Sequence, residues 1–152
     1  MTSQKPTDLV EQFLSDLASG RVDAALAEVD EQIVYTNVGL PTVRGKRRFS
    51  SVMRGLNGDF IGFDAQMLAI AADEAGVVLT ERIDELRFGP LRLRFWVCGR
   101  FEVIEGRIAV WRDYFDVFDC TKAAVRALAA LVIPSLQRPL DEPLSRREPS
   151  LS

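Results

Sequence analysis

The chain has 152 residues, 47% of them hydrophobic and 27% charged, which matches one soluble domain large enough to bury its own core. Its formal net charge of −3 argues against non-specific nucleic-acid binding, which requires a basic surface. The chain contains no histidine, which excludes Ser–His–Asp and Cys–His catalysis and zinc sites built on histidine.

The first third of the chain alternates between helical and strand patterns. Apolar residues recur at helical spacing after Thr7, a predicted N-cap, as far as the stop signal Gly20. A short second helix is predicted over 23–29 and a first strand over 33–38. A basic helix with one apolar stripe follows over 45–56.

From Phe60 onward the apolar period changes to two, which predicts four long strands joined by short turns. The turns contain Gly76, Gly89 and Gly106, residues that favour tight reversals. The predicted strands span 60–72, 77–88, 91–104 and 107–118. Because each strand follows the previous one after a short turn, we predict an antiparallel meander.

The C-terminal part is predicted to form one helix and a disordered tail. Asp119 can cap a helix over 121–131, and Pro134 ends the pattern. Residues 137–152 are rich in proline, serine and charge, which is typical of disorder. We therefore predict one α+β domain over 1–136, in which helices on the concave face of a curved sheet enclose a cone-shaped pocket.

The apolar residues of this last helix have several possible roles. Core packing is the favoured interpretation, and pocket lining, a dimer contact or a position near membrane lipid are the alternatives. The residues concerned are Val125, Leu128, Leu131, Val132 and Ile133.

The N-terminus and the cysteine content predict a reduced, cytoplasmic protein. The opening residues MTSQKPTDLVEQF lack the apolar core of a signal peptide, and no run of about eighteen apolar residues could span a membrane. Two cysteines, Cys98 and Cys120, are too few for a disulfide scaffold or a four-thiolate zinc site.

Polar residues interrupt the apolar faces of three predicted strands. Arg82 and Asp84 share one face of the strand 77–88, whereas Glu81 and Glu85 share the other face, which suits solvent. In the last strand, Asp113 is the single interruption of an otherwise apolar face. Two further polar groups, Tyr35 and Asn37, share a face of the first strand.

A carboxylate on an apolar face is unfavourable unless it is paired or protonated. Arg82 is the obvious partner, because its planar guanidinium can bond two carboxylates at once. A buried Asp–Arg pair can also be purely structural, Tyr35 can be a core aromatic, and Asn37 can end a strand. Five such groups together suggest a site. Alternation alone leaves the structural and the functional interpretation open.

Three segments carry a resemblance to a known family: Tyr35-Thr36-Asn37, Thr80-Glu81-Arg82-Ile83-Asp84, and Trp111-Arg112-Asp113-Tyr114-Phe115-Asp116 preceded by Gly106-Arg107-Ile108. With these segments in order and at compatible spacing, the chain resembles the limonene-epoxide hydrolase family from about the first helix to Phe118. The stretch 91–103 looks like mycobacterial and actinobacterial members.

The resemblance implies a curved, mainly antiparallel mixed sheet with helices that close a deep pocket. This architecture is shared with nuclear-transport-factor-2-like and ketosteroid-isomerase-like domains. It further implies a homodimer that uses no metal or organic cofactor, and whose partners are a lipophilic epoxide and water.

The resemblance also implies a role for each of the five polar residues. Asp113 would be the general base, taking a proton from a water held by Tyr35 and Asn37. Asp84 would be the general acid that protonates the epoxide oxygen, and Arg82 would bridge the two carboxylates. The reaction would be concerted, without a covalent intermediate, and would give a vicinal diol.

Bulky apolar side chains and their neighbours are expected to line the pocket, which would suit a terpene, fatty or sterol epoxide. The candidates are Val78, Thr80, Leu93, Phe95, Val97, Trp111 and Phe115, with Leu79 and Phe101 as further possibilities. Two alternatives share this fold: a ketosteroid-isomerase-like proton-transfer enzyme and a non-catalytic lipid-binding domain. Arg82 argues against the first, because a guanidinium bridge better suits a water-activating carboxylate pair.

Overall fold

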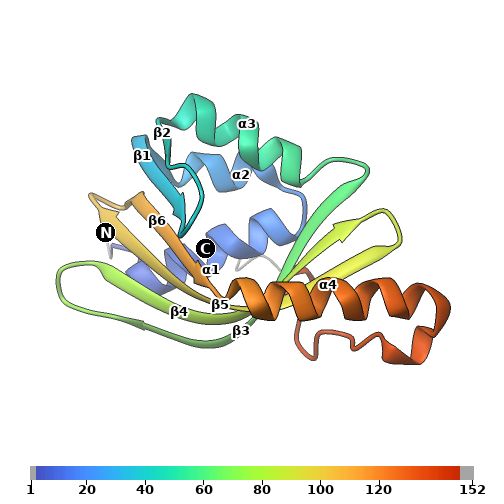
Figure 1. Ribbon diagram of the computed structural model, residues 1–152. Helices are drawn as coiled ribbons and strands as arrows, with labels where there is room; N and C mark the ends of the chain where they lie inside the picture. Colours follow the sequence, from blue (N-terminus) through green and yellow to red (C-terminus); the bar gives the residue numbers. More distant parts are fainter. Residues whose placement is uncertain (1–2, 148–152) are drawn as a thin grey trace.

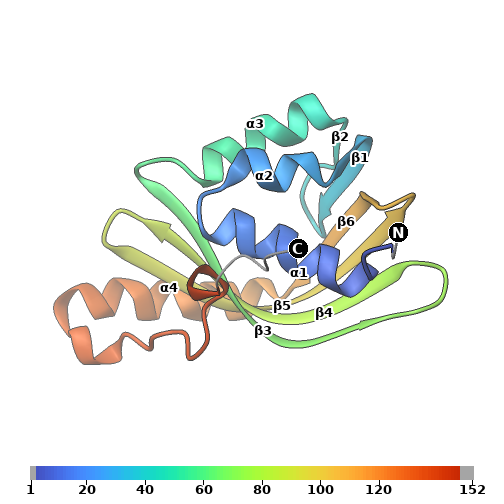
Figure 2. The same ribbon diagram turned by 180° about the vertical axis from the view of Figure 1, so that it is seen from behind.

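The computed structural model describes residues 3–147, in which helices pack on both sides of one curved six-stranded sheet (Figures 1 and 2). The predicted α+β class with a mixed sheet is confirmed. The elements in chain order are α1 (Pro6–Ala18), α2 (Val22–Ala27), β1 (Val29–Asn37), β2 (Val43–Arg44), α3 (Lys46–Leu56), β3 (Ile61–Ala72), β4 (Val77–Phe88), β5 (Leu91–Ile104), β6 (Arg107–Phe115), α4 (Val117–Val132) and the short 3₁₀ helices η1 (Pro134–Leu136) and η2 (Leu144–Arg146).

The sheet has the strand order β2-β1-β6-β5-β4-β3. Strands β3 to β6 form the predicted antiparallel meander. β1 lies parallel to β6, which makes the sheet mixed. This pairing sets Asn37 opposite Asp113 and Tyr35 opposite Trp111. Residues from the two ends of the domain therefore meet at the centre of the sheet.

Helices α1, α2 and α3 lie within the concave side of the sheet (Figure 1). α1 buries one face against the sheet, and Phe13 at its centre contacts Trp111 and Phe101. The helix begins at Pro6 with Lys5 in the N-cap position, so the predicted cap at Thr7 is wrong. Proline suits the first helical position because its missing N–H would be unpaired there in any case.

β6 ends three residues before its predicted end at 118, and α4 begins earlier than predicted. The N-cap is Asp116, whose Oδ1 accepts hydrogen bonds from the backbone N–H of Phe118 at 2.7 Å and of Asp119 at 3.0 Å. The predicted cap at Asp119 is therefore wrong. Asp116 and Asp119 can both cap a helix. In the sequence, the apolar residues Val117 and Phe118 continue the strand pattern, although both are exposed in the structure.

α4 lies on the convex side of the sheet and turns its small residues inward. Ala123, Ala127 and Ala130 are buried, and their small size allows the helix to approach β5 closely. The larger apolar residues of the helix are exposed, so their assignment to the core is wrong; they are Val125, Leu128, Leu131, Val132 and Ile133.

The convex face of the sheet also carries a buried carboxylate. Glu85 was expected in solvent, but it is buried and accepts a hydrogen bond from Arg94 Nε at 2.6 Å. The two residues are direct partners in the β4–β5 register. α4 and the chain after it cover this face, which alternation along β4 alone does not reveal.

The segment 137–147 differs from the predicted disorder. Leu144 is fully buried against α1 and β3, and its carbonyl oxygen accepts a hydrogen bond from Ser15 Oγ. Ser145 donates to the Asp64 carboxylate, and Pro143 forms a bridge with Gln66. The composition of this mostly polar segment does not reveal that one of its leucines is buried. The remainder of the predicted tail, 148–152, lies outside the described residues.

Candidate active site

A cavity of about 400 Å³ lies between the concave face of the sheet and α3. Five of the seven predicted pocket residues line it: Leu93, Phe95, Val97, Trp111 and Phe115. So do Asp84 and Asp113, and Tyr35 and Asn37 from β1. Nine further residues line the cavity and were not predicted from the sequence. All but Leu86 lie outside the strands β4 to β6: Leu17, Leu40, Val52, Met53, Leu56, Asn57, Phe63, Leu86 and Cys120.

Four pocket candidates lie elsewhere. Val78 and Phe101 are fully buried in the core beneath α1, and Leu79 is exposed on the convex face. Thr80 is buried outside the cavity wall, where its Oγ1 accepts a hydrogen bond from Arg82 Nη1 at 3.0 Å. Alternation identifies the face of a strand but not how far along the strand the cavity extends.

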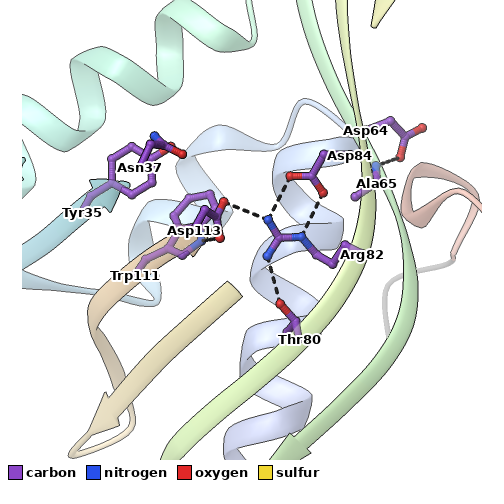
Figure 3. A network of polar contacts seen from close by, with 9 residues as sticks. All are labelled: Tyr35, Asn37, Asp64, Ala65, Thr80, Arg82, Asp84, Trp111 and Asp113. Atoms are coloured by element: carbon purple, nitrogen blue, oxygen red, sulfur yellow. Dashed lines mark hydrogen bonds and ion pairs between the residues drawn. The ribbon is translucent and has the colours of Figure 1, made fainter. Parts of the chain in front are cut away.

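Arg82 holds the two carboxylates together from behind the cavity wall (Figure 3). Its side chain is 0% exposed. Nε and Nη2 donate to the two oxygens of Asp84, both at 2.9 Å, and Nη2 also donates to Asp113 Oδ2 at 2.8 Å. With Thr80 on Nη1, each nitrogen of the guanidinium has a partner. One cation is thus shared by two carboxylates that face one cavity.

Gly99 provides the space in which Arg82 reaches Asp113. It lies on β5 between Thr80 of β4 and Asp113 of β6 in the sheet register. A Cβ atom at this position would lie 2.5 Å from Arg82 Nη1, 2.6 Å from Thr80 Oγ1 and 2.9 Å from Asp113 Oδ1. Sequence reasoning missed Gly99, although a glycine inside a strand is a known signal of close approach.

We expect Gly99→Ala to reduce both stability and turnover. The methyl group would displace the guanidinium or the Asp113 carboxylate from hydrogen-bond distance, and overpacking of this kind costs about 1–3 kcal/mol. Urea denaturation and kcat would measure the two effects. Gly55→Ala is the matched control, because a Cβ there meets no atom within 4 Å. A Gly99→Ala variant that matches this control in both assays would contradict the packing argument.

Asp113 has a second donor and lies beside an aromatic wall. Trp111 Nε1 donates to Asp113 Oδ1 at 2.7 Å, so both carboxylate oxygens are held. The Trp111 ring stacks on Phe101 and lies 4.7 Å from the Tyr35 ring, centroid to centroid.

Asn37 Nδ2 donates to Tyr35 Oη at 2.7 Å. The side-chain carbonyl oxygen of Asn37, Oδ1, and the Tyr35 hydroxyl hydrogen therefore remain free to bond a small polar molecule.

Burial shapes the protonation of the cluster. Burial is the main cause that raises the pKa of Asp113; the negative charge of Asp84 raises it further, and Arg82 and Trp111 oppose the shift. Burial, followed by the charge of Asp113, also raises the pKa of Tyr35. Burial disfavours the charge on Arg82, but the two aspartates outweigh it and raise the Arg82 pKa. The phenol and the guanidinium thus keep their protons at neutral pH.

The charge balance of this cluster favours the uptake of one proton. Two ionised carboxylates and one guanidinium sum to a net charge of −1 in a buried place, and one added proton makes the cluster neutral. A carboxyl beside a carboxylate is the pairing required for combined acid and base chemistry. Among the described residues, no group of three side chains from His, Cys, Asp and Glu is arranged to hold a metal ion.

Comparison with known proteins gives consistent matches. The model of the limonene-1,2-epoxide hydrolase catalytic domain matches residues 4–126. Epoxide hydrolase EphG of Mycobacterium tuberculosis is 49% identical over 131 residues, which are 86% of this chain and 87% of that protein. The structure of an M. tuberculosis LEH-like epoxide hydrolase has a TM-score of 0.84 at 47% identity, and covers 89% of this chain and 95% of that chain.

A more distant match bears on the fold alone. The crystal structure of a putative polyketide cyclase from Xanthomonas campestris has a TM-score of 0.66 at 21% identity, and covers 80% of this chain and 98% of that chain. The fold is thus shared by proteins whose sequences differ widely.

Proposed function

This chain belongs to the limonene-1,2-epoxide hydrolase family and is an epoxide hydrolase; from that premise we propose that Asp113 and Asp84 act as its general base and general acid. The observation that carries the proposal is the shared Arg82, whose Nη2 bonds both carboxylates at the wall of one cavity. Because Nη2 lies 2.9 Å from Asp84 Oδ2 and 2.8 Å from Asp113 Oδ2, the two acids are close enough to act on one small substrate.

Water is activated by Asp113. In the parallel register of β1 with β6, Asn37 lies opposite Asp113 and Tyr35 opposite Trp111, and the Asn37 side-chain amide donates to the Tyr35 hydroxyl. A water held between these groups would be oriented for proton transfer to the carboxylate. The raised pKa of Asp113 favours this role, because its ionised form binds a proton more strongly than an exposed aspartate does.

The ring opens in one step in which every proton is accounted for. Water loses a proton to the Asp113 carboxylate and its oxygen bonds to one epoxide carbon. The bond from that carbon to the epoxide oxygen breaks, and the Asp84 carboxyl gives its proton to that oxygen. The product is a vicinal diol, with Asp113 protonated and Asp84 ionised. Transfer of a proton from Asp113 back to Asp84 restores the reactive form.

We expect turnover to fall on both sides of a broad pH optimum. At low pH both carboxyls are protonated and no base remains; at high pH the cluster loses its shared proton and no acid remains. Because burial and the charge of Asp84 raise the pKa of Asp113, loss of the shared proton, and with it the alkaline limb, should lie above the pKa range of an exposed aspartate. The test is kcat from about pH 4 to pH 10. A rate that stays constant into strongly alkaline solution would contradict the two-carboxyl mechanism.

The substrate is a lipophilic epoxide of the terpene, fatty or sterol type. Most of the cavity wall is apolar, including Leu56, Phe63, Leu93 and Phe115, and its two carboxylates, Asp84 and Asp113, lie on either side of the Arg82 guanidinium (Figure 3). Such a site binds a molecule with one polar group on an apolar frame.

A panel of terpene, fatty-acid and sterol epoxides tests this specificity, with propylene oxide as the small polar reference. We expect diol from at least one lipophilic member, at a kcat/KM at least tenfold above that of propylene oxide, because about 1.4 kcal/mol of apolar contact gives this ratio. A preference for propylene oxide would contradict the proposed substrate class.

The same proposal includes a homodimer, as the family resemblance implies, and a place in the cytoplasm, as the N-terminus and cysteine content predict. The exposed apolar residues Val125, Leu128 and Val132 on α4 support a protein contact, since such patches mark interfaces. Sedimentation at the mass of a single chain would contradict the dimer.

The free cysteines Cys98 and Cys120 are compatible with a reducing compartment. Within 3–147, no helix is long and apolar enough to cross a membrane.

A further inference from the structure

A second cavity, of about 410 Å³, lies on the convex side of the sheet. Its walls come from β3 to β5, from α4 and from the chain at 136–140. Figure 1 shows α4 running along this side, away from α1, α2 and α3. Of the residues that line the catalytic cavity, only Phe95 also lines this one. The two cavities are therefore separate binding spaces on opposite faces of one sheet.

Positive charge is concentrated in this second cavity. Four arginines line it, Arg92, Arg94, Arg126 and Arg138, against one carboxylate, Asp119. That carboxylate already accepts a hydrogen bond from the backbone N–H of Trp96 and pairs with Lys122. In the described part of the chain, Arg92, Arg126 and Arg138 form no ion pair. A protein with a net charge of −3 thus presents an unneutralised cationic cavity.

Arg94 lies deepest among these arginines. Its side chain is 13% exposed, and its Nε donates to Glu85 Oε2 at 2.6 Å. Its Nη1 is buried and has no hydrogen-bond partner among the described residues. An unpaired buried donor costs about 1–3 kcal/mol. Because Nη1 itself is buried, an anion in the cavity would be held by the exposed arginines Arg92, Arg126 and Arg138. The flat guanidinium is also the side-chain group best shaped for a carboxylate.

The rest of the wall is apolar. Ile83 from β4, Ala123 and Ala127 from α4, and Leu136 and Leu140 from the following segment line the same space. A small hydrophilic anion would leave this surface uncovered. A ligand with an anionic head and an apolar chain would satisfy both halves of the wall, and the volume lies in the range of small-molecule sites.

We propose that this second cavity binds an amphipathic anion, a long-chain carboxylate, with its head on the arginines and its chain along the apolar wall. The wall of the catalytic cavity presents the carboxylates Asp84 and Asp113, which disfavour a second carboxylate beside them. The proposal concerns a site outside the epoxide chemistry, so its failure would leave the assignment of Asp113 and Asp84 unaffected.

Isothermal titration of the full chain with dodecanoate tests the proposal, with 1-dodecanol and acetate as ligands that lack the charge or the chain. We expect one saturable dodecanoate site per chain, at least tenfold tighter than for either reference ligand. The double variant Arg126→Gln/Arg138→Gln should weaken dodecanoate at least tenfold and leave the rate of epoxide hydrolysis unchanged. Both arginines are exposed, so their replacement leaves the core intact.

Arg48→Gln is the matched control, because Arg48 is an exposed arginine on α3 outside this cavity. It should bind dodecanoate as the wild type does. Three results would overturn the proposal: no saturable binding, equal affinity for 1-dodecanol, or unchanged affinity in the double variant. If the double variant instead lost self-association while dodecanoate affinity stayed the same, the arginines would serve a contact with a second copy, which also overturns it.

Discussion

The Asp113→Asn variant is expected to form diol about 10²–10⁴ times more slowly than the wild type, the usual contribution of a general base. Asparagine has nearly the same shape, and its carbonyl oxygen can still accept one of the two hydrogen bonds, from Trp111 Nε1 or from Arg82 Nη2. It cannot take a proton from water. The loss should therefore appear in kcat at neutral pH, with the fold preserved.

A matched control for this variant is Asp59→Asn, an exposed aspartate outside the catalytic cavity. It should keep the wild-type rate. Thermal unfolding of both variants would separate a chemical effect from a structural one. A rate for Asp113→Asn within tenfold of the wild type, with the protein folded, would remove Asp113 from its proposed role.

Replacement of Arg82 should cause the largest loss of stability. Arg82→Met keeps much of the side-chain length but leaves Asp84 and Asp113 buried without their common partner. Breaking a buried ion pair from one side costs about 3–5 kcal/mol. The loss should be greatest at neutral pH and smaller in acid, because protonation removes the uncompensated carboxylate charges.

Urea denaturation at neutral and at acidic pH, for wild type and variant, measures this dependence. A second variant, Arg82→Met/Asp113→Asn, removes one of the stranded carboxylates and should recover part of the lost stability at neutral pH. An equal loss at both pH values, with no recovery in the double variant, would mean that Arg82 acts through packing rather than through charge.

The long strands were the most predictable part of the fold. The period of two along β3 to β6 gives their positions to within a few residues, because each strand has one face in the core and short turns fix the order. The parallel pairing of β1 with β6 joins distant parts of the chain and leaves no local pattern. The same holds for Leu144, whose burial depends on contacts with α1 and β3.

The residues of the site were predictable to the extent that burial makes polar groups conspicuous. Arg82, Asp84 and Asp113 interrupt apolar faces, and the structure brings them together. Gly99 carries no chemistry and was missed, although its lack of a side chain makes the cluster possible. Leu40 and Cys120 reach the cavity from a loop and from α4, where strand alternation gives no information. Resemblance to a family supplied the acid and base roles, which no spacing could assign.

The central claim is that Asp113 activates a water that attacks the epoxide directly, rather than attacking the epoxide itself. A single turnover in ¹⁸O-labelled water, with enzyme in excess over epoxide, distinguishes the two. Direct attack predicts that the diol of the first turnover already carries one ¹⁸O atom. Unlabelled diol in that turnover would mean that its new oxygen came from a carboxylate through a covalent ester, and would contradict the account.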